Sequence, residues 1–578
     1  MDQFSGKVAL VTGAGNGFGK AFALEAARRG MKVALLDIDQ ADIEGVKVLL
    51  RQQGVNDVMT VATDLSIYEN VKKAVGLVME KYGQVDVLFN NPGVCPLGDI
   101  VHMPARDFDW GISINLNAHA YMLMEVLPIM IKQKTPAHIM EVSSIAGILH
   151  GGATGTTYAA TKHASLALAE DVRAYLKRNH IDTIGVSVFC PGFIQTDLHH
   201  YERHRPERFR NEKDPFYHSE MNQKLQNFLS VSIQTGIPLD GIAFRLFKAI
   251  EQNQMYVLTH PKFLEKIQMR HHGIEKDFET AEHRNITVDY KGKVALVTGA
   301  AHGFGKVFAE EAAAQGMKLA LVDIDKTALE EIAENLKKSG TEVLAIHSDA
   351  SVYEEVVESV KKVKETYGQI DVLFNNAGVA TSQDLVHLHH QDWDWVIGVN
   401  LVGQTYYMKE VLPIMIAQKT KANIITTSSI AGLIPGFGLN PSYSASKHGT
   451  VAVTECVKQY LELAGIDYIK VALFCPAFIQ TNLHHSESYR PARFAIANDP
   501  EHYASEDYKD SQRRLEHNIT TGIPIDNVAK RLFASMEGEE TYIITHPETL
   551  SAVQTRHRAI EDACKSELTL WDVYALMD

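Results

Sequence analysis

Residues 6–20 read GKVALVTGAGNGFGK, and residues 292–306 read GKVALVTGAAHGFGK. In each stretch an apolar run rich in β-branched residues ends in a glycine-rich turn, after which a helical pattern begins. Glycines at such a turn let the backbone bend sharply and approach a pyrophosphate, which the free amides of the helix N-terminus stabilise. A turn that only packs a helix on a strand is about as common, so the motif alone is a weak indication of a dinucleotide site. The candidate cofactor residues of the two turns are Gly13, Asn16, Gly17, Phe18 and Gly19, and Gly299, His302, Gly303, Phe304 and Gly305.

The two stretches belong to an internal repeat that extends over most of the 578 residues. GKVALVTGA begins at Gly6 and at Gly292, an offset of 286 (292 − 6). The phrases YAATKHAS at Tyr158 and YSASKHGT at Tyr443 have an offset of 285 (443 − 158). A repeat this long is a duplicated globular unit, because solenoid repeats are only about 20–50 residues long. We expect one domain in residues 1–284 and a second in residues 285–578.

Within each copy, short apolar runs alternate with longer helical stretches. In the first copy the runs are KVALVTG, KVALLDI, DVMTVATD, VDVLFNN, HIMEVSS, IGVSVFC and MYVLTH. Runs of this kind, separated by helices, are typical of a parallel sheet that is covered on both faces. The sequence therefore predicts an α/β fold of two tandem doubly wound parallel-sheet (Rossmann-like) domains.

The composition limits the classes of partner. A net charge of −15 argues against general attraction to nucleic acid or to an anionic membrane. The N-terminus has no basic segment followed by a long apolar run, and no run reaches about 18 apolar residues, so we expect a cytoplasmic protein without a membrane partner. Five scattered cysteines lack metal-ligand spacing, which favours reduced structural thiols and no metal.

A carboxylate ends the second apolar run of each copy, at Asp37 and at Asp323. Each lies about 20 residues beyond the glycine turn, where an acidic side chain accepts hydrogen bonds from the adenosine ribose and repels a 2′-phosphate. We therefore expect NAD rather than NADP in both copies. The alternative interpretation of each aspartate is that it caps the next helix.

The repeated Tyr-x-x-x-Lys phrase places Tyr158 and Lys162 on one helical face, and Tyr443 and Lys447 likewise. A lysine ammonium held beside a tyrosine stabilises the phenolate and lowers its pKa, so that the phenol can exchange a proton. A lone pair at this spacing means little, but here it follows, after 14 residues, a serine that ends a buried run (158 − 144 and 443 − 429). Each serine is expected at the carboxyl edge of the sheet, where ligands bind.

Together these residues resemble the classical short-chain dehydrogenases/reductases, over nearly the whole chain as two consecutive family domains. The resemblance rests on T-G-x-x-x-G-x-G, the strand-end aspartate, N-N-x-G, the Asn-Ser-Tyr-Lys tetrad and P-G-x-x-x-T. It implies that tyrosine is the general acid/base, that lysine lowers its pKa and holds the nicotinamide ribose, that serine polarises the substrate oxygen, and that asparagine holds a relay water. The implied catalytic residues are Asn115, Ser144, Tyr158 and Lys162, and Asn400, Ser429, Tyr443 and Lys447. Further implied cofactor contacts are Asp64 and Asp349 at the adenine, Asn90 and Asn375 after the fourth strand, and Thr196 and Thr481 at the carboxamide.

Two positions depart from the family pattern. Pro92 stands where the family usually has alanine, and it removes a backbone donor at the expected cofactor wall. In the second copy Ala477 replaces the glycine of P-G-x-x-x-T. Either change is expected to weaken cofactor binding in its own half, while both tetrads stay complete.

The segments after the two threonines, residues 197–221 and 482–507, are expected to form a lid over the substrate. Arg205 and Arg490 in these segments either anchor an anionic group of the substrate or pin the lid by a salt bridge. The paired histidines at 199–200 and 484–485 are expected to be solvated rather than metal-bound. Aromatic residues in the lids indicate an apolar or aromatic substrate body, and a similar Arg-Pro lid occurs in family members that oxidise bulky hydrophobic secondary alcohols.

The sequence therefore predicts a tandem NAD-dependent alcohol dehydrogenase or ketone reductase with two active sites. Three alternatives remain: halves that oxidise and re-reduce one carbinol and so epimerise it, one active half with one structural half, and an NAD-binding sensor without turnover.

Two further expectations concern the relation between the copies. Pro435, Phe437 and Leu439 are expected to narrow the second pocket relative to the Gly-rich segment of the first. The halves are expected to pack as a pseudo-symmetric dimer through residues 165–176 and 451–461, and whole chains to pair again.

Overall fold

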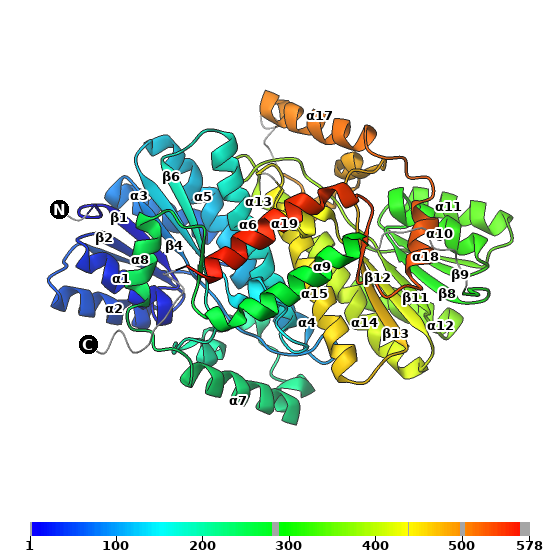
Figure 1. Ribbon diagram of the computed structural model, residues 1–578, viewed down its shortest axis with the longest axis horizontal. Helices are drawn as coiled ribbons and strands as arrows, with labels where there is room; N and C mark the ends of the chain where they lie inside the picture. Colours follow the sequence, from blue (N-terminus) through cyan, green and yellow to red (C-terminus); the bar gives the residue numbers. More distant parts are fainter. Residues whose placement is uncertain (1–2, 280–287, 437, 497–502, 567–578) are drawn as a thin grey trace.

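The computed structural model describes residues 3–279, 288–436, 438–496 and 503–566, so the predicted domain boundary and Phe437 lie outside the described residues. Within them are two seven-stranded parallel sheets, ordered β3-β2-β1-β4-β5-β6-β7 and β10-β9-β8-β11-β12-β13-β14 (Figure 1). The first sheet contains β1 (Val8–Thr12), β2 (Lys32–Asp37), β3 (Val58–Ala62), β4 (Val87–Asn90), β5 (Ala137–Val142), β6 (Ile184–Cys190) and β7 (Tyr256–Leu258). The second contains β8 (Val294–Thr298), β9 (Lys318–Asp323), β10 (Val343–His347), β11 (Val372–Asn375), β12 (Ala422–Thr427), β13 (Ile469–Cys475) and β14 (Tyr542–Ile544).

Helices cover both faces of each sheet. Those of the first half are α1 (Gly17–Arg28), α2 (Gln40–Gln52), α3 (Tyr68–Tyr82), α4 (Ala105–Ile112), α5 (Ala118–Gln133), α6 (Thr156–Arg178), α7 (Glu220–Gln234), α8 (Ile242–Glu251) and α9 (Leu264–Glu279). Those of the second half are α10 (Gly303–Ala314), α11 (Lys326–Lys338), α12 (Tyr353–Tyr367), α13 (His390–Ile397), α14 (Gln404–Gln418), α15 (Pro441–Leu463), α17 (Glu506–Thr520), α18 (Val528–Ser535) and α19 (Leu550–Cys564). The predicted doubly wound architecture is confirmed in both halves.

The strand order of each sheet fixes where a ligand can bind. β1 pairs with β2 on one side and β4 on the other, so that Val11 lies opposite both Leu35 and Phe89. Every residue of β1 is buried, because helices cover both faces of the sheet. The order reverses between β1 and β4, and a crevice therefore opens beyond the carboxyl ends of these two strands. β8 and β11 make the same arrangement in the second half.

The two halves contact each other through α6 and α15, the helices on which the Tyr-x-x-x-Lys phrases lie. Ala159 of α6 packs with Ala452 and Cys456 of α15 in a small apolar cluster. Small side chains let the two helices approach closely. Ala452 and Cys456 fall within the segment 451–461 that was expected at the interface, whereas Ala159 precedes the expected segment 165–176 on the same helix.

Two tyrosine–aspartate hydrogen bonds flank this contact in a pseudo-symmetric way. Tyr121 on α5 donates to Asp394 on α13 (Oη to Oδ1, 2.5 Å), and Tyr406 on α14 donates to Asp109 on α4 (2.5 Å). Burial raises the pKa of Asp394 to about 7 and that of Asp109 to about 6.

Residues 105–133, which include α4 and α5, are long and apolar enough to span a membrane, but 72% of their apolar window is buried inside the protein. This is the behaviour of a core helix.

The last helix of each half packs against the other half. α9 follows β7 in the chain, yet its Ile274 and Phe278 belong to a core cluster with Tyr542 and Ile544 of β14. Asp277 of α9 accepts a hydrogen bond from the amide of Tyr542 (2.9 Å). α9 therefore completes the edge of the second sheet.

The reciprocal contact is made by α19, which follows β14 but packs against β7 of the first half. Arg556 of α19 pairs with Glu170 of α6 (Nε to Oε1, 2.9 Å), and Tyr256 of β7 donates to the same carboxylate (2.6 Å). α9 and α19 lie side by side (Figure 1), and His271 and His557 stack between them with ring centroids 3.7 Å apart.

One interface contact has a carboxylate in the first half where the second half has a thiol. Asp171 on α6 accepts a hydrogen bond from the amide of Gly438 (3.1 Å), in the segment before α15. A Cβ on Gly438 would lie 2.4 Å from the backbone nitrogen of Tyr175, so only glycine fits. The residue that corresponds to Asp171 in the second half is Cys456 (171 + 285). Burial raises the pKa of the Asp171 carboxyl to about 7.

We predict that Asp171 makes stability depend on pH. The folded carboxyl binds its proton more tightly than the unfolded one, whose pKa is 3.8, so stability is lost as pH rises through this window to about 7. Asp171→Asn keeps an acceptor for Gly438 and removes the charge. Its Tm should exceed that of the wild type at about pH 8, and should fall less than the wild-type Tm between about pH 5 and pH 8.

The control for this comparison is Asp562→Asn, because the Asp562 side chain is 76% exposed. A wild-type pH profile in Asp171→Asn would contradict the assignment.

Candidate active sites

The glycine-rich turns connect β1 to α1 and β8 to α10 at the predicted crevices. Gly13 and Gly17 have φ values of +58° and +48°, which favour glycine. A Cβ on Gly13 would lie 3.2 Å from the Cα of Pro92. Gly19 has a different function, because its Cβ would lie 1.9 Å from the carbonyl oxygen of Gly13, so it lets α1 pack on the turn. The second half has the same geometry at Gly299, Gly303 and Gly305.

The strand-end aspartates do not cap helices. Asp37 accepts hydrogen bonds from the amides of Gly15 (2.9 Å) and Asp39 (3.1 Å), and so lies against the glycine turn. The cap of α2 is Asp39, which accepts from two amides of the first turn. In the second half Asp323 accepts from Ala301 (2.8 Å), and Asp325 caps α11. The capping interpretation of the two strand-end residues is therefore wrong.

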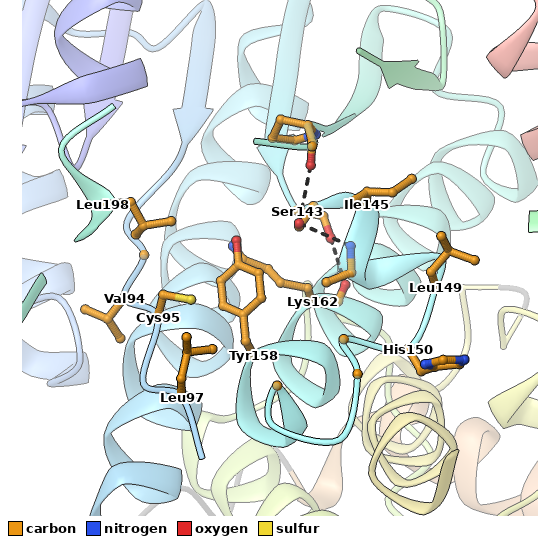
Figure 2. A pocket seen from close by; sticks show the side chains of 18 of the residues that line it. Val94, Cys95, Leu97, Ser143, Ile145, Leu149, His150, Tyr158, Lys162 and Leu198 are labelled. Carbon is orange, nitrogen blue, oxygen red and sulfur yellow. Dashed lines mark hydrogen bonds between the residues drawn. The ribbon is translucent and has the colours of Figure 1, made fainter. Parts of the chain in front are cut away.

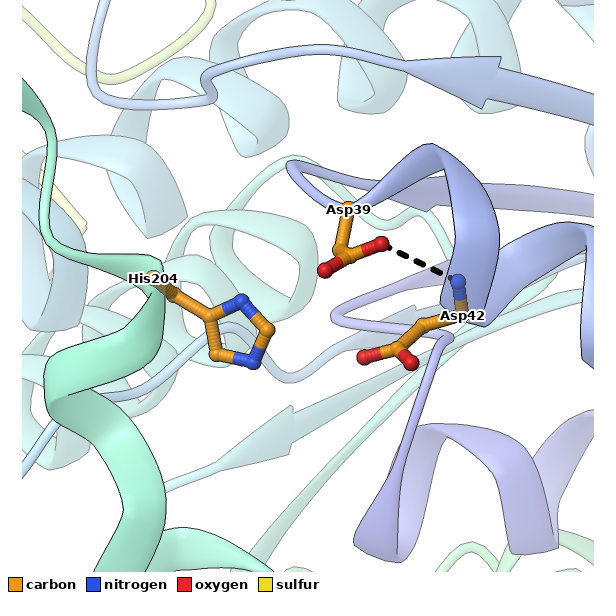
Figure 3. Close-up of side chains that lie close together, drawn as sticks. All are labelled: Asp39, Asp42 and His204. Atoms are coloured by element: carbon orange, nitrogen blue, oxygen red, sulfur yellow. Dashed lines mark hydrogen bonds between the residues drawn. The ribbon is translucent and has the colours of Figure 1, made fainter.

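Asp39, Asp42 and His204 lie close together at the outer edge of this region (Figure 3). Among the described residues they are the one group whose ligand atoms are near enough to hold a metal ion. Asp39 already caps α2, and Asp42 accepts from Asn16 (2.5 Å) and from the lid residue Arg203 (3.0 Å). Through these contacts, the cluster connects the glycine turn, α2 and the lid.

Three of the four predicted catalytic residues of the first half, Ser144, Tyr158 and Lys162, line one cavity, and Figure 2 shows Tyr158 and Lys162 in it. Tyr158 and Lys162 project from α6, with Lys162 Nζ 5.8 Å from the centre of the tyrosine ring. Lys162 donates to the carbonyl of Val142 at the end of β5 (2.9 Å). Ser144, two residues on, donates to the carbonyl of Pro191 (3.3 Å).

The second half repeats this arrangement. Lys447 Nζ lies 5.4 Å from the ring centre of Tyr443 and donates to the carbonyl of Thr427 (2.8 Å). Ser429 donates to the carbonyl of Pro476 (3.1 Å). The structure thus brings together the serine, tyrosine and lysine that the sequence singles out in each copy.

The asparagines of the two tetrads lie in π-helical turns, Ser113–Asn117 and Gly398–Gly403. Such a turn is common at functional sites, because it breaks the regular hydrogen-bond ladder of a helix. Asn115 uses its side-chain amide to accept from the amide of Val94 (2.8 Å) and to donate to its carbonyl (2.9 Å). Asn400 does the same with Val379. Each asparagine therefore fixes the loop that forms one wall of the crevice.

Burial dominates the electrostatics of the tyrosine–lysine pairs. Desolvation raises the pKa of Tyr158 well above its usual value, while a hydrogen bond with Ser144 acts in the opposite direction. Burial raises the pKa of Tyr443 to about 12 and lowers the pKa of Lys162 to about 8 and of Lys447 to about 7. The expected lowering of the tyrosine pKa is thus outweighed by desolvation of the phenolate in this structure.

One pair of predicted cofactor residues needs correction. Asn90 and Asn375 are the last residues of β4 and β11 and are fully buried, with their side chains bonded to backbone carbonyls of the following helix region. The next residues, Asn91 and Asn376, line the cavities instead and donate to the carbonyls of the glycine turns. A strand reverses its side chains at every residue, so an assignment one position early selects the wrong face.

The expected effect of Pro92 also changes. The equivalent residue, Ala377, donates its amide to Thr298 (3.0 Å), so this hydrogen bond is internal to the wall. In the first half Thr12 still receives the amide of Asn91 (2.9 Å). Pro92 therefore removes a wall contact rather than a donor that faces the crevice.

Ala477, the second departure from the family pattern, keeps its backbone in place because its amide contacts the side chain of His546 (3.4 Å).

The lid arginines are buried structural cations. Arg205 pairs with Asp107 of α4 (2.6 Å) and with Glu202, and its guanidinium lies 4.1 Å from the ring centre of Trp110. Arg490 makes the equivalent contacts with Asp392, Glu487 and Trp395. Neither arginine is available as an anion anchor, so the salt-bridge alternative is correct.

A second lid arginine in each half has a contact that sequence analysis missed. Arg208 reaches across the crevice to Asp64 (2.7 Å), and Arg493 reaches Asp349 (2.6 Å). The carboxylates expected at the adenine are therefore bridged to the lids. The repeated phrases RPERF and RPARF contain these arginines, and their recurrence was the available signal.

The two cavities differ greatly in size. The first has a volume of about 1140 Å³ and extends from Gly13, Asp37 and Thr196 past Ser144, Tyr158 and Lys162 to side chains of the second half. The second, of about 170 Å³, is lined by Gly299, Asp323, Tyr443, Lys447 and Thr481. The second cavity is the smaller one, as predicted, but the predicted cause is wrong for Pro435 and Leu439, because neither residue lines it, and Phe437 lies outside the described residues.

The sequence model of the short chain dehydrogenase family matches residues 7–207 and 293–491. The protein therefore belongs to the short chain dehydrogenase family, with one family domain in each half.

Three similar proteins each match about half of the chain. A CLA biosynthesis dehydrogenase/reductase of Lactiplantibacillus plantarum is 44% identical over 47% of this chain and 94% of its own. A C alpha-dehydrogenase of a Sphingobium species is 29% identical over 48% of this chain and 87% of its own. A crystal structure of a short chain dehydrogenase/reductase from Burkholderia phymatum in complex with NAD is 35% identical over 48% of this chain and 96% of its own, with a TM-score of 0.45.

We predict that Arg205 holds the first lid closed. Arg205→Met leaves the buried Asp107 carboxylate without its cation, a change that typically costs about 3–5 kcal/mol. Hydrogen exchange of residues 198–218 should accelerate strongly, while exchange in the second lid stays as in the wild type.

The matched control is Arg210→Met, because the Arg210 side chain is 46% exposed. The double variant Arg205→Met/Asp107→Leu should recover part of the protection. Wild-type exchange in Arg205→Met would contradict the assignment.

Proposed function

We propose that both halves transfer a hydride between NAD and a hydrophobic secondary alcohol or ketone. The observation that carries this proposal is the first cavity, in which Ser144, Tyr158 and Lys162 share one lined space with the glycine turn and with Asp37. The second half supports the same chemistry with an equivalent tyrosine, lysine and strand-end aspartate around its smaller cavity.

The residues present fit a dinucleotide with an unphosphorylated ribose. The amides at the start of α1 and the absence of a side chain on Gly13 and Gly17 suit the pyrophosphate. The Asp37 carboxylate, fixed by the amides of Gly15 and Asp39, suits two ribose hydroxyls and opposes a further negative charge. Asp323 repeats this arrangement, which favours NAD in both halves.

In the proposed reaction, each of the side chains around the first cavity has a separate role. A nicotinamide held in this cavity would supply or accept the hydride at the carbinol carbon. Tyr158 Oη gives a proton to the substrate oxygen in reduction and takes it in oxidation, while Ser144 donates a hydrogen bond to the same oxygen. Lys162, anchored on the carbonyl of Val142, would hold the ribose of the cofactor. The lid, pinned by Arg205 and Arg208, excludes water.

An apolar substrate body suits the walls of the first cavity. Val94, Cys95 and Leu97 lie on one side of Tyr158, and Leu149 lies on the other (Figure 2). Aliphatic walls with a few convergent polar groups are typical of sites for small apolar ligands. The relatives named above are dehydrogenases or reductases, which is consistent with carbinol or carbonyl chemistry.

We predict that each half has its own turnover. Tyr158→Phe and Tyr443→Phe each remove one proton donor, so each single variant should keep the activity of the other half, and the double variant should lose at least about a hundredfold of the total. The measurement is reduced nicotinamide absorbance with a panel of hydrophobic secondary alcohols and NAD.

The outcomes separate the alternatives. If one substitution abolishes all turnover, the other half is a structural partner. Inversion of the carbinol without net cofactor change indicates an epimerase, and cofactor binding without turnover of any kind indicates a sensor.

We predict that the strand-end aspartates select NAD. Asp37→Ser removes repulsion of a 2′-phosphate in the first half, so in a Tyr443→Phe background the NAD:NADP ratio of kcat/KM should fall about tenfold or more. Asp323→Ser in a Tyr158→Phe background is the matched variant for the second half. Equal use of NAD and NADP by the unmodified protein would contradict this prediction.

A further inference from the structure

Three large apolar side chains are exposed at the mouth of the first cavity, and we name them the apolar rim. Phe193 follows β6 and is 41% exposed, Phe228 on α7 is 56% exposed, and Met269 on α9 is 68% exposed. All three also line the cavity that contains Tyr158. Exposed apolar groups gathered at one place mark a binding surface more often than scattered ones do.

The apolar rim continues the inner wall of the cavity. Phe193 and Phe228 meet edge to face, with ring centroids 6.2 Å apart. Beneath them Leu229 and Ile233 of α7 line the same cavity and are buried. Leu229 and Ile233 pack in one apolar cluster with Tyr158, so an apolar surface leads from this tyrosine to Phe228 and Phe193, while Met269 lines the same cavity from α9. Burying apolar surface against a ligand is favourable by about 25 cal/mol per Å².

The second half replaces two of the three rim residues with polar ones. Phe193 corresponds to Phe478 (193 + 285), but Phe228 corresponds to Arg514 (228 + 286) and Met269 to Thr555 (269 + 286). Arg514 and Thr555 are exposed. The half with the smaller cavity is thus also the half with the more polar rim.

We propose that the apolar rim is a subsite for an extended apolar substrate body, present in the first half only, with Phe228 and Met269 as specificity-determining residues. This proposal rests on the proposed function, since the reacting carbonyl is placed at Tyr158 and the apolar body leads from it to the rim. Met269 lies on α9, which packs against the second sheet, so the second half positions part of the subsite of the first. The two sites consequently accept substrates of different length.

The test exchanges residues between the halves. In a Tyr443→Phe background, where only the first half turns over, Phe228→Arg and Met269→Thr each introduce the residue of the second half. The substrates are straight-chain methyl ketones from butanone to undecanone, with reduced NAD. Each methylene contact contributes about 0.8 kcal/mol, so loss of two such contacts lowers the undecanone:butanone ratio of kcat/KM by about tenfold.

Val231→His is the matched control. Val231 is an exposed apolar residue of the same helix that does not line the cavity, and His517 is its counterpart in the second half. The control should keep the wild-type ratio. Unchanged ratios in Phe228→Arg and Met269→Thr would overturn the proposal, and so would an equal loss in the control.

A binding measurement separates this proposal from the proposed function. Anilinonaphthalene sulfonate is bound to the full chain and displaced by undecanone, and the displacement should need about tenfold more ketone in Phe228→Arg. If no ketone is reduced but this shift is seen, the apolar subsite stands and the proposed reaction fails. If ketones are reduced and neither the ratio nor the displacement changes, the subsite fails alone.

Discussion

The close contact between α6 and α15 positions both candidate active sites. Ala159, Ala452 and Cys456 form its centre, and a Cβ on Gly449 would lie 3.3 Å from the carbonyl oxygen of Ala160 on the opposite helix. Small side chains are thus a steric requirement of the contact rather than a matter of composition. The same two helices carry the tyrosine–lysine pairs, so packing between the halves and the geometry of the two sites are determined by the same pair of helices.

Charged groups surround this apolar centre in reciprocal pairs. Arg556 meets Glu170, and Arg270 meets Glu455 in the equivalent place (3.0 Å). Taking such ions out of water costs free energy that their attraction only partly offsets, so intact pairs add little to stability, whereas loss of one partner leaves a buried charge uncompensated. His271 stacks on its counterpart between the two pairs, and burial lowers its pKa to about 2, which keeps the stack uncharged.

The sequence was sufficient for features that depend on local periodicity, and insufficient for those that depend on a distant partner. Buried runs and the repeated Tyr-x-x-x-Lys phrase predicted both sheets and the grouping of Tyr158 with Lys162. The partner of Arg205 is Asp107, 98 residues away, and no pattern in the lid indicates it. Likewise, the apolar face of α9 predicts a buried helix but not that the burying surface belongs to the other half. Asn90 rather than Asn91 follows from the family resemblance alone, because the run VDVLFNN does not show which of its two adjacent asparagines faces the crevice.

Because α9 and α19 each pack against the opposite half, the two halves complete their folds at different times during synthesis. α9 has already been synthesised when β14 leaves the ribosome, so these two elements can pack at once. β7 can pack against α19, which carries Arg556 and Ile560, only after nearly 300 further residues have been added. In that interval Glu170 and Tyr256 lack their cation and their apolar cover. The first half, although translated first, therefore completes its fold last, and a ribosome stalled before residue 550 presents an incomplete surface to chaperones.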